Sequence, residues 1–272
     1  MSTYGFVTEL ATLATSVAEK TDVLTPAVKG GYAVAGGGRL KRGLLWRSGQ
    51  HHGASDADLA RIAALGLADV FDLRSSRERE SHPCRRPDAF AAAIYLSDDP
   101  THIAAPHLAA AATSGSRDAA SVREGMRRNY GGIAFRPELI AMIRRQLAVL
   151  AEGRGASLVN CMAGKDRTGI AVAMIQLAAG VHRDDVLADY LLTNSAGDVE
   201  ARIAAGAETI RAVARQMGPE VLRVIMGVEA VYLEAAFDMI GERHGSLEGY
   251  LRDVLGVDGD LRAKLREQLV EA

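Results

Sequence analysis

Cysteine is scarce in this chain. It occurs at only two of 272 positions, Cys84 and Cys161, which excludes a small fold held together by several disulfides. Few cysteines are typical of a reducing compartment, where a lone thiol is either core filler or a nucleophile. The chain is also long enough to bury a sizeable core without disulfides or a structural metal.

A surplus of charge and long apolar runs are missing as well. The chain carries 32 Lys and Arg against 34 Asp and Glu, a net charge of −2, so no basic field indicates nucleic acid as a partner. No apolar run reaches the ~18 residues of a membrane span. The N-terminus has no Lys or Arg before Lys20, unlike a secretory signal. We expect a cytoplasmic chain without an integral membrane segment. Secretion by a route that needs no signal peptide is the alternative.

The order of predicted elements favours an α/β fold. Strands are expected at 43–47, 67–73, 89–96 and 156–160, and helices at 55–65, 137–150 and 168–179. Ser55 and Asp58 form a capping box at the start of the first of these helices. Alternating strands and helices predict a central, mostly parallel sheet of about four or five strands flanked by helices. The glycine-dense stretch 30–38 is typical of a turn or hairpin.

The second half of the chain shows helical patterns only. After residue 180, helices are expected at 184–193, 199–217, 219–242, 247–255 and 259–270. We interpret 1–272 as a single domain, with an α/β core over about 28–197 and a helical part over about 198–272 packed on it. Residues 101–125 have no clear period and are interpreted as a loop or a partly helical insertion. This stretch and residues 198–217 are our candidates for a lid.

Chemistry-bearing residues are concentrated between residues 158 and 169. A strand is expected to end at Asn160, Cys161 follows, and Arg167 and Thr168 open a helix. The free amides and the dipole at a helix N-terminus favour a thiolate and can surround a phosphate dianion. Arg167 can bind two phosphate oxygens, and Lys165 adds a second cation.

Other residues of this segment fit the same interpretation. Gly164 and Gly169 permit close approach of the backbone, and the Thr168 hydroxyl can donate to the sulfur. A nucleotide-binding Walker loop is excluded, because Lys165 is followed by Asp166 rather than Ser or Thr. A buried structural cysteine would explain Cys161 alone, but not the charged residues that follow it.

The segment from Cys161 to Gly169 resembles the signature loop of bacterial protein tyrosine phosphatases, including members with dual specificity. Residues 45–49, 72–78, 188–194 and 245–251 also resemble family segments in family order, so the resemblance covers about 40–270. It implies a cysteine-phosphatase fold and hydrolysis through a phosphocysteine, without metal or cofactor. The expected substrates are phosphotyrosine, phosphoserine or phosphothreonine in proteins, and phosphoinositides. It also implies that the phosphate-binding residues are Met162, Ala163, Gly164, Lys165, Thr168 and Gly169.

Three places compete for the acid that protonates the leaving oxygen. Asp166 lies within the loop, as in some lipid-directed relatives, and Asp72 ends a strand and matches a family carboxylate. Asp98 or Asp99, before Pro100, resembles the mobile acid loop of other tyrosine phosphatases. An ion pair with Arg74 or Arg47 would be the structural alternative for Asp72.

Two features leave other functions open. Asn160 stands where the family usually has His, which motivates a pseudophosphatase that binds phosphorylated partners without turnover. Rhodaneses and arsenate reductases also use a cysteine loop on an α/β fold. Rhodanese loops rarely carry Lys-Asp-Arg, however, and arsenate reductase-like enzymes place their cysteine near the N-terminus. Cys84 is either a plain thiol or a partner for Cys161 under oxidation.

Overall fold

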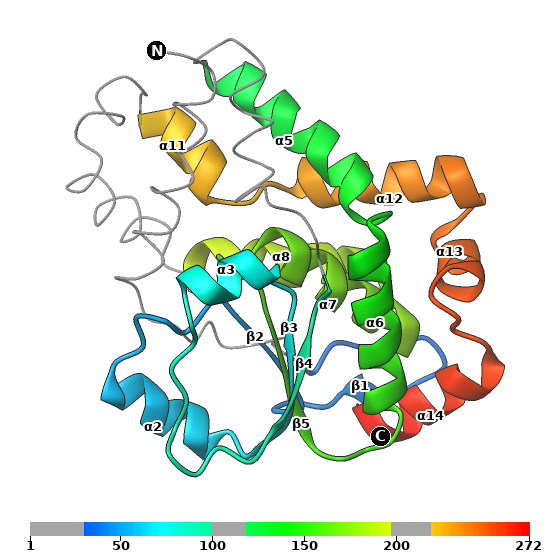
Figure 1. Cartoon of the computed structure of the whole chain (residues 1–272). Coiled ribbons are helices and arrows are strands. Elements are labelled where there is room, and N and C mark those ends of the chain that lie inside the picture. The colour runs from blue at the N-terminus through cyan, green and yellow to red at the C-terminus, as the bar shows by residue number, and fades with distance from the viewer. Residues whose placement is uncertain (1–29, 99–117, 197–218) are drawn as a thin grey trace.

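The computed structural model describes residues 30–98, 118–196 and 219–272 (Figure 1). The expected helix at 199–217, both lid candidates for the most part, and Asp99 lie outside the described residues. Within the described ranges, no helix combines the length and the apolar character needed to cross a bilayer.

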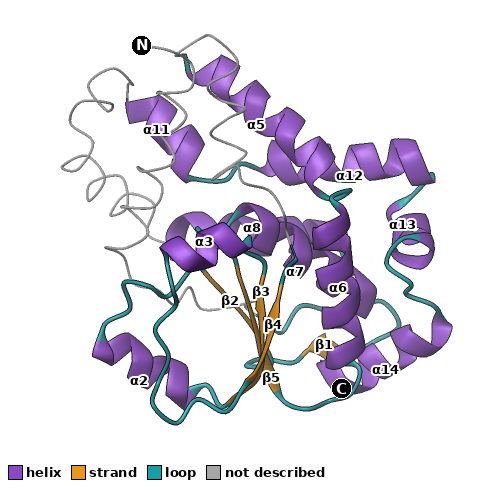
Figure 2. Cartoon of the chain, viewed as in Figure 1, coloured by secondary structure: helices purple, strands orange, loops and turns teal. Residues whose placement is uncertain are grey.

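The central sheet has four parallel strands, which confirms the expected fold class. They are β2 (Leu45–Ser48), β3 (Leu67–Asp72), β4 (Ala93–Leu96) and β5 (Ala156–Asn160), in the order β2-β5-β3-β4 (Figure 2). In the register, Asn160 pairs with Ser48 on one side and with Asp72 on the other. These three residues therefore share the carboxyl edge of the sheet, where ligands of open α/β sheets bind.

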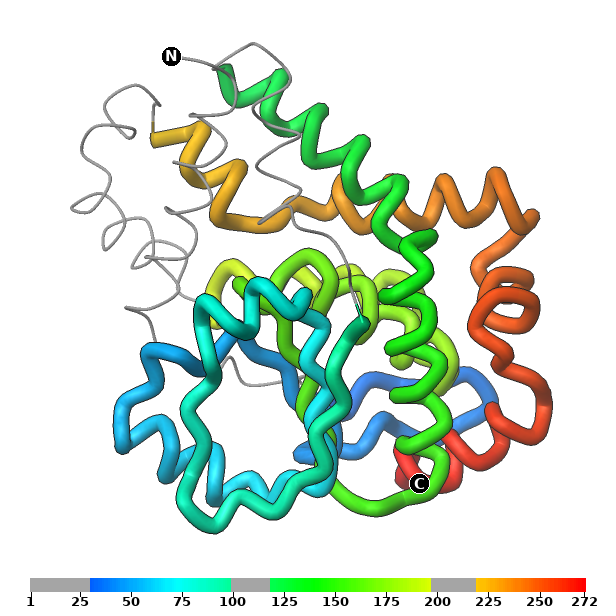
Figure 3. Tube along the Cα trace, in the orientation of Figure 1, coloured from blue at the N-terminus to red at the C-terminus, as the bar shows by residue number. Residues whose placement is uncertain are grey.

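The helices surround this sheet and extend beyond its carboxyl edge. They are α2 (Asp56–Ala64), α3 (Ser76–Ser81), α5 (Ala119–Ile133), α6 (Pro137–Leu150), α7 (Asp166–Ala179), α8 (Arg183–Ala196), α11 (Pro219–Met226), α12 (Ala230–His244), α13 (Leu247–Asp253) and α14 (Gly259–Leu269). Helix α7 is buried along nearly its whole length, as its apolar sequence predicts. Helices α5, α11 and α12 pack together beyond the carboxyl ends of the strands (Figure 3).

The sequence-based predictions of the elements were wrong in four places. Helix α5 was not expected beyond residue 125, and the short helix α3 was not expected at all. The helix expected over 219–242 is two helices, α11 and α12, and the first ends directly before Gly227. Glycine fits this turn, because a Cβ at residue 227 would lie 2.8 Å from the Arg223 carbonyl oxygen. Strand β6 (Val270–Glu271) pairs antiparallel with β1 (Arg39–Leu40), where only helix was expected.

Buried apolar residues from both parts of the chain form one hydrophobic core. It includes Val159 and Ile175 of the α/β part as well as Ile225, Tyr232 and Leu265 of the helical part. The single-domain interpretation itself stays a prediction, since its internal boundary near residue 198 lies outside the described residues.

Candidate active site

The turn between β5 and α7 holds the expected nucleophile. Cys161 follows the last residue of the strand and is 3 % exposed. Gly164 has φ +69°, and a Cβ on it would lie 2.5 Å from the carbonyl carbon and oxygen of Ser48. Arg47 donates from Nη2 to the Gly164 carbonyl oxygen at 2.9 Å. Only glycine fits this close approach, so the loop is shaped directly against the end of β2.

A buried histidine supports the segment that follows β2. The Nε2 atom of His51 lies 2.9 Å from Ser48 Oγ, and its Nδ1 lies 3.1 Å from Arg86 Nη1. Burial, together with the charges of Arg86 and Arg74, lowers the pKa of His51 to about 3. The ring is therefore neutral: Nδ1 accepts from Arg86, and Nε2–H donates to Ser48.

Arg167, the second residue of α7, is held in place by a glutamate. Its two terminal nitrogens donate to Glu78 at 2.8 and 2.7 Å, and Nη1 also donates to the Leu73 carbonyl oxygen at 3.0 Å. Burial alone would raise the pKa of Glu78, but the Arg167 charge and the Ser75 N–H hold it below its usual value. The carboxylate is thus ionised and orients the guanidinium by a bidentate pair.

Glu78 belongs to a capping box at the start of α3. The Glu78 N–H donates to Ser75 Oγ, and the Glu78 carboxylate accepts from the Ser75 N–H at 2.8 Å. This motif is readable from the sequence. Its link to Arg167, 89 residues further along the chain, is not.

Asp166 is the first residue of α7 and contacts a pair of buried tyrosines. Tyr130 of α5 donates its hydroxyl to Asp166 Oδ1 at 2.7 Å, and Tyr190 of α8 donates to the Tyr130 hydroxyl at 2.7 Å. Burial, and then the Asp166 charge, raise the pKa of Tyr130 well above its ordinary value. Tyr130 therefore keeps its proton and acts as a hydrogen-bond donor to the aspartate.

Asp72 is the last residue of β3, beside the end of β5, and it forms a buried ion pair. Both of its carboxylate oxygens accept from the Arg74 guanidinium, the shortest contact being 2.6 Å. The Asn160 amide also donates to Asp72 Oδ1 at 3.1 Å. Asn160 therefore couples the end of β5 to the Asp72–Arg74 pair. Arg74 in turn donates to Cys84 Sγ at 3.0 Å.

The Lys165 side chain leaves the loop for a neighbouring helix. Its ammonium is 2.5 Å from the Ile225 carbonyl oxygen, 3.4 Å from that of Gly227 and 3.7 Å from Asp166 Oδ1. Sequence reasoning assigned this cation to phosphate, but these contacts are with the end of α11.

A cavity lies directly over the loop, and only some of the expected site residues line it. It is lined by Asn129, Ile133, Arg136, Cys161, Met162, Ala163, Asp166 and Arg167. Cys161, Arg167 and Asp166 are thus brought together with Met162 and Ala163. Asp72 and Lys165 do not line it.

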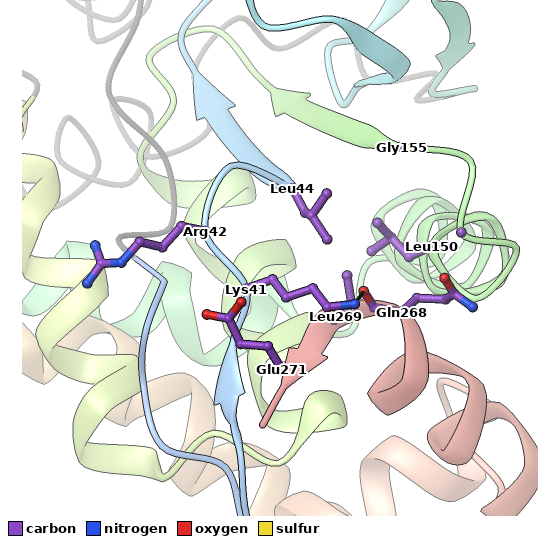
Figure 4. A pocket seen from close by; sticks show the side chains of 9 residues that line it. Lys41, Arg42, Leu44, Leu150, Gly155, Gln268, Leu269 and Glu271 are labelled. Atoms are coloured by element: carbon purple, nitrogen blue, oxygen red, sulfur yellow. Dashed lines mark hydrogen bonds between the residues drawn. The ribbon is translucent and has the colours of Figure 1, made fainter.

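A larger cavity of about 350 Å³ lies at the opposite end of the sheet. Leu44, directly before β2, and Gly155, directly before β5, line it together with Gln268 and Lys41 (Figure 4). Cys161 follows the other end of β5, so this cavity is separate from the candidate active site.

Comparison with known proteins assigns the family. Residues 29–271 match the model of the tyrosine phosphatase family. The triple specificity protein phosphatase PtpB of Mycobacterium tuberculosis is 36% identical over 242 residues, which is 79% of this chain and 86% of the relative. A protein of Cupriavidus necator assigned as a tyrosine-protein phosphatase is 36% identical over 238 residues, 84% of this chain and 80% of the relative.

The chain belongs to the tyrosine phosphatase family. This confirms the resemblance stated from the loop and its flanking segments, and with it the cysteine-dependent phosphatase activity. A rhodanese or an arsenate reductase would belong to a different family. The individual roles expected of site residues in this tyrosine phosphatase stay predictions.

The remaining expected site residues of this tyrosine phosphatase are placed as follows. Gly169 packs against Tyr190, whose ring would lie 2.8 Å from an added Cβ. Thr168 is fully buried, and its hydroxyl has no hydrogen-bond partner among the described residues. Asp98 is exposed at the end of the β4 segment. Cys84 and Cys161 are both free thiols.

Among the residues that sequence reasoning missed, four polar ones support or line the site. Glu78 and Tyr130 contact the two charged residues of α7, and Asn129 and Arg136 line the cavity. Arg136 donates from Nη2 to Asn129 Oδ1 at 2.9 Å. The capping box marks Glu78 in the sequence, but no sequence signal identifies the other three.

Proposed function

We propose that this chain hydrolyses phosphotyrosine, and also phosphoserine and phosphothreonine, through a phosphocysteine at Cys161. The observation that carries the proposal is the juxtaposition of Cys161, Arg167 and Asp166 in one cavity at the N-terminus of α7. The triple specificity named for the mycobacterial relative supports the wider range of phosphorylated residues. Phosphoinositides are proposed as a further substrate class on the resemblance of the loop alone.

The reaction has two steps. In the first, the Cys161 thiolate attacks phosphorus, an S–P bond forms, the P–O bond breaks, and the leaving oxygen takes a proton from an acid. In the second, water gives a proton to the carboxylate left by the first step and attacks phosphorus, the S–P bond breaks, and the thiolate leaves. Arg167, oriented by Glu78, and the amides of residues 162–167 stabilise the charge on the equatorial oxygens in both steps.

We assign the acid to Asp166 in preference to Asp72. Asp166 lines the cavity beside Cys161, where a leaving oxygen can reach it. Asp72 does not line this cavity, and both of its oxygens are engaged by Arg74. We propose that Asp72 holds the strand end through Asn160. Asp98 is the third candidate, because it is exposed and is not among the described residues that line the cavity.

The loop residues Met162, Ala163, Gly164, Thr168 and Gly169 are proposed to bind the phosphate through their backbone or to allow its close approach. The proposal needs no metal or cofactor, and it names a phosphorylated protein or a phosphoinositide as the partner, with no nucleic acid. The cytoplasm is the proposed location.

The test is turnover by wild type and Cys161→Ser on a phosphotyrosine peptide. Wild type should release phosphate steadily, form a phosphocysteine detectable by mass spectrometry after rapid acid quench, and be inhibited competitively by vanadate. Cys161→Ser should bind the peptide without turnover. Retention of more than about a tenth of kcat, a loss below ~1.4 kcal/mol, would overturn the assignment of the nucleophile. Binding without turnover by wild type would favour the pseudophosphatase.

A further inference from the structure

We propose that Lys165 is a positioning residue that fastens the C-terminal end of α11 to the phosphate loop, and that it is not a second phosphate ligand. The proposal concerns how the loop is coupled to the wall of the cavity. Its main readout is structural, so it can fail while the proposed phosphatase reaction stands.

The surroundings of the Lys165 ammonium are those of a helix C-cap. The Ile225 and Gly227 carbonyl oxygens, at 2.5 and 3.4 Å, belong to the last turn of α11 and the residue after it. The carbonyls at the end of a helix lack partners within the helix and carry partial negative charge, so a cation there is stabilising.

Because the Lys165 side chain is buried, its contacts with the two carbonyl oxygens are structurally required. Lys165 is 2 % exposed, and an ammonium removed from water is tolerated only when acceptors surround it. Two carbonyl oxygens accept from the ammonium, and the oppositely charged Asp166 carboxylate lies 3.7 Å from it. Turning this group toward a phosphate would break its two hydrogen bonds with the end of α11.

A second side chain, on helix α8, holds the same corner, meaning residues 225–228 at the end of α11 and directly after it. Asn194 of α8 accepts from the Val228 N–H and donates to the Val228 carbonyl oxygen, both at 2.8 Å. Gly227 lies between the two anchors, where a Cβ would be 3.0 Å from Asn194 Oδ1. The chain therefore offers a matched control, since Asn194 acts on the same corner without belonging to the loop.

The corner matters to the site because α11 packs on α5 (Figure 1). Asn129 and Ile133 of α5 line the cavity over Cys161. Lys165 thus links the loop that binds phosphate to the helix that supports the opposite wall of the same cavity. Loss of the link should affect all substrates alike, whatever charge they carry.

The experiment compares wild type, Lys165→Met and Asn194→Ala. Amide hydrogen exchange at residues 222–227 should become at least about 5-fold faster in both variants, because both release the same corner. Competitive inhibition of p-nitrophenyl phosphate turnover by phosphate and by pyrophosphate gives a ratio of inhibition constants. That ratio should stay within about 2-fold of wild type in both variants, since no phosphate contact is lost.

Two results would overturn the proposal. One is unchanged exchange at 222–227 in Lys165→Met. The other is a ratio that shifts about 10-fold against pyrophosphate in Lys165→Met but not in Asn194→Ala, which would make the lysine a phosphate ligand. If Lys165→Met does not fold, an experiment on wild type alone decides. Binding of orthovanadate at Cys161 should slow amide exchange at residues 222–227, because Lys165 couples the loop to this segment and such coupling acts in both directions. No slowing would then refute it.

Discussion

Replacing Glu78 with Gln should disable Arg167 while leaving the fold in place. The Glu78 carboxylate accepts two bonds from Arg167 and one from the Ser75 N–H. Glutamine is isosteric but uncharged, and its NH2 group must face a donor at one of these positions. At least one bond to Arg167 is therefore lost, together with the charge attraction.

The magnitude follows from the burial of the pair. Arg167 and Glu78 have side chains 12% and 8% exposed, and breaking a buried ion pair from one side costs about 3–5 kcal/mol. Because one hydrogen bond can survive in the amide, we expect a stability loss of about 2–3 kcal/mol. A misoriented Arg167 should lower kcat/KM by about 10- to 100-fold, or ~1.4–2.7 kcal/mol.

Asp58→Asn provides the matched control. Asp58 occupies the same position in the capping box of α2 as Glu78 does in that of α3, but no contact links it to Arg167 within the described residues. It should cost about 1 kcal/mol of stability and leave kcat/KM unchanged. p-Nitrophenyl phosphate is the right substrate, because its leaving group needs no acid. A Glu78→Gln enzyme within about 3-fold of wild-type kcat/KM would refute the reasoning.

The acid limb of stability gives an independent check. The pKa of Glu78 in the folded chain is held below its ordinary value of 4.5. The ionised group therefore stabilises the fold above pH 4.5, and this stabilisation is lost as pH falls through the lower folded value. Glu78→Gln should show a shallower loss of stability below pH 4.5 than wild type, measured by urea unfolding. Parallel acid limbs in the two proteins would contradict the ion pair.

Three further outcomes concern pH profiles of kcat/KM on an alkyl phosphate. Asp166→Asn should flatten the descending limb and Asp72→Asn should not; the reverse would make Asp72 the acid. Tyr130→Phe removes a donor to the Asp166 carboxylate and should move the descending limb to higher pH, and an unmoved limb would show that Asp166 is not the titrating acid. Asn160→His places a titratable cation before the nucleophile and should move the ascending limb to lower pH, while a shift to higher pH would contradict stabilisation of the thiolate.

The loop and its two flanking elements could be predicted because their signals are local. A buried strand, a cysteine and a glycine-bounded charged turn before an apolar helix lie within residues 156–179, and the structure has β5 and α7 there. The parallel sheet followed from alternation along the chain. An ion pair of Asp72 with Arg74 or Arg47 was expected as one alternative, and the structure has the pair with Arg74, two positions further along the chain.

Helix α5 could not be predicted because tertiary packing stabilises it. It contains Gly125, Gly131 and Gly132, which disfavour an isolated helix. Its Met126 and Tyr130 are fully buried, and α5 packs against α11 and α12, which come about a hundred residues later. Burial of this face offsets the poor intrinsic propensity, a gain that no local pattern reveals.

The side chains of Lys165, Asp166 and Arg167 show that residue type alone does not predict which way a loop side chain points. The three consecutive charges point to three different helices: the end of α11, Tyr130 of α5 and Glu78 of α3. A turn that binds a phosphate dianion must gather N–H groups that repel one another, so it needs support from outside. Partners far away in sequence supply that support, and for this reason Glu78→Gln should impair the Arg167 function almost as a change in the loop itself would.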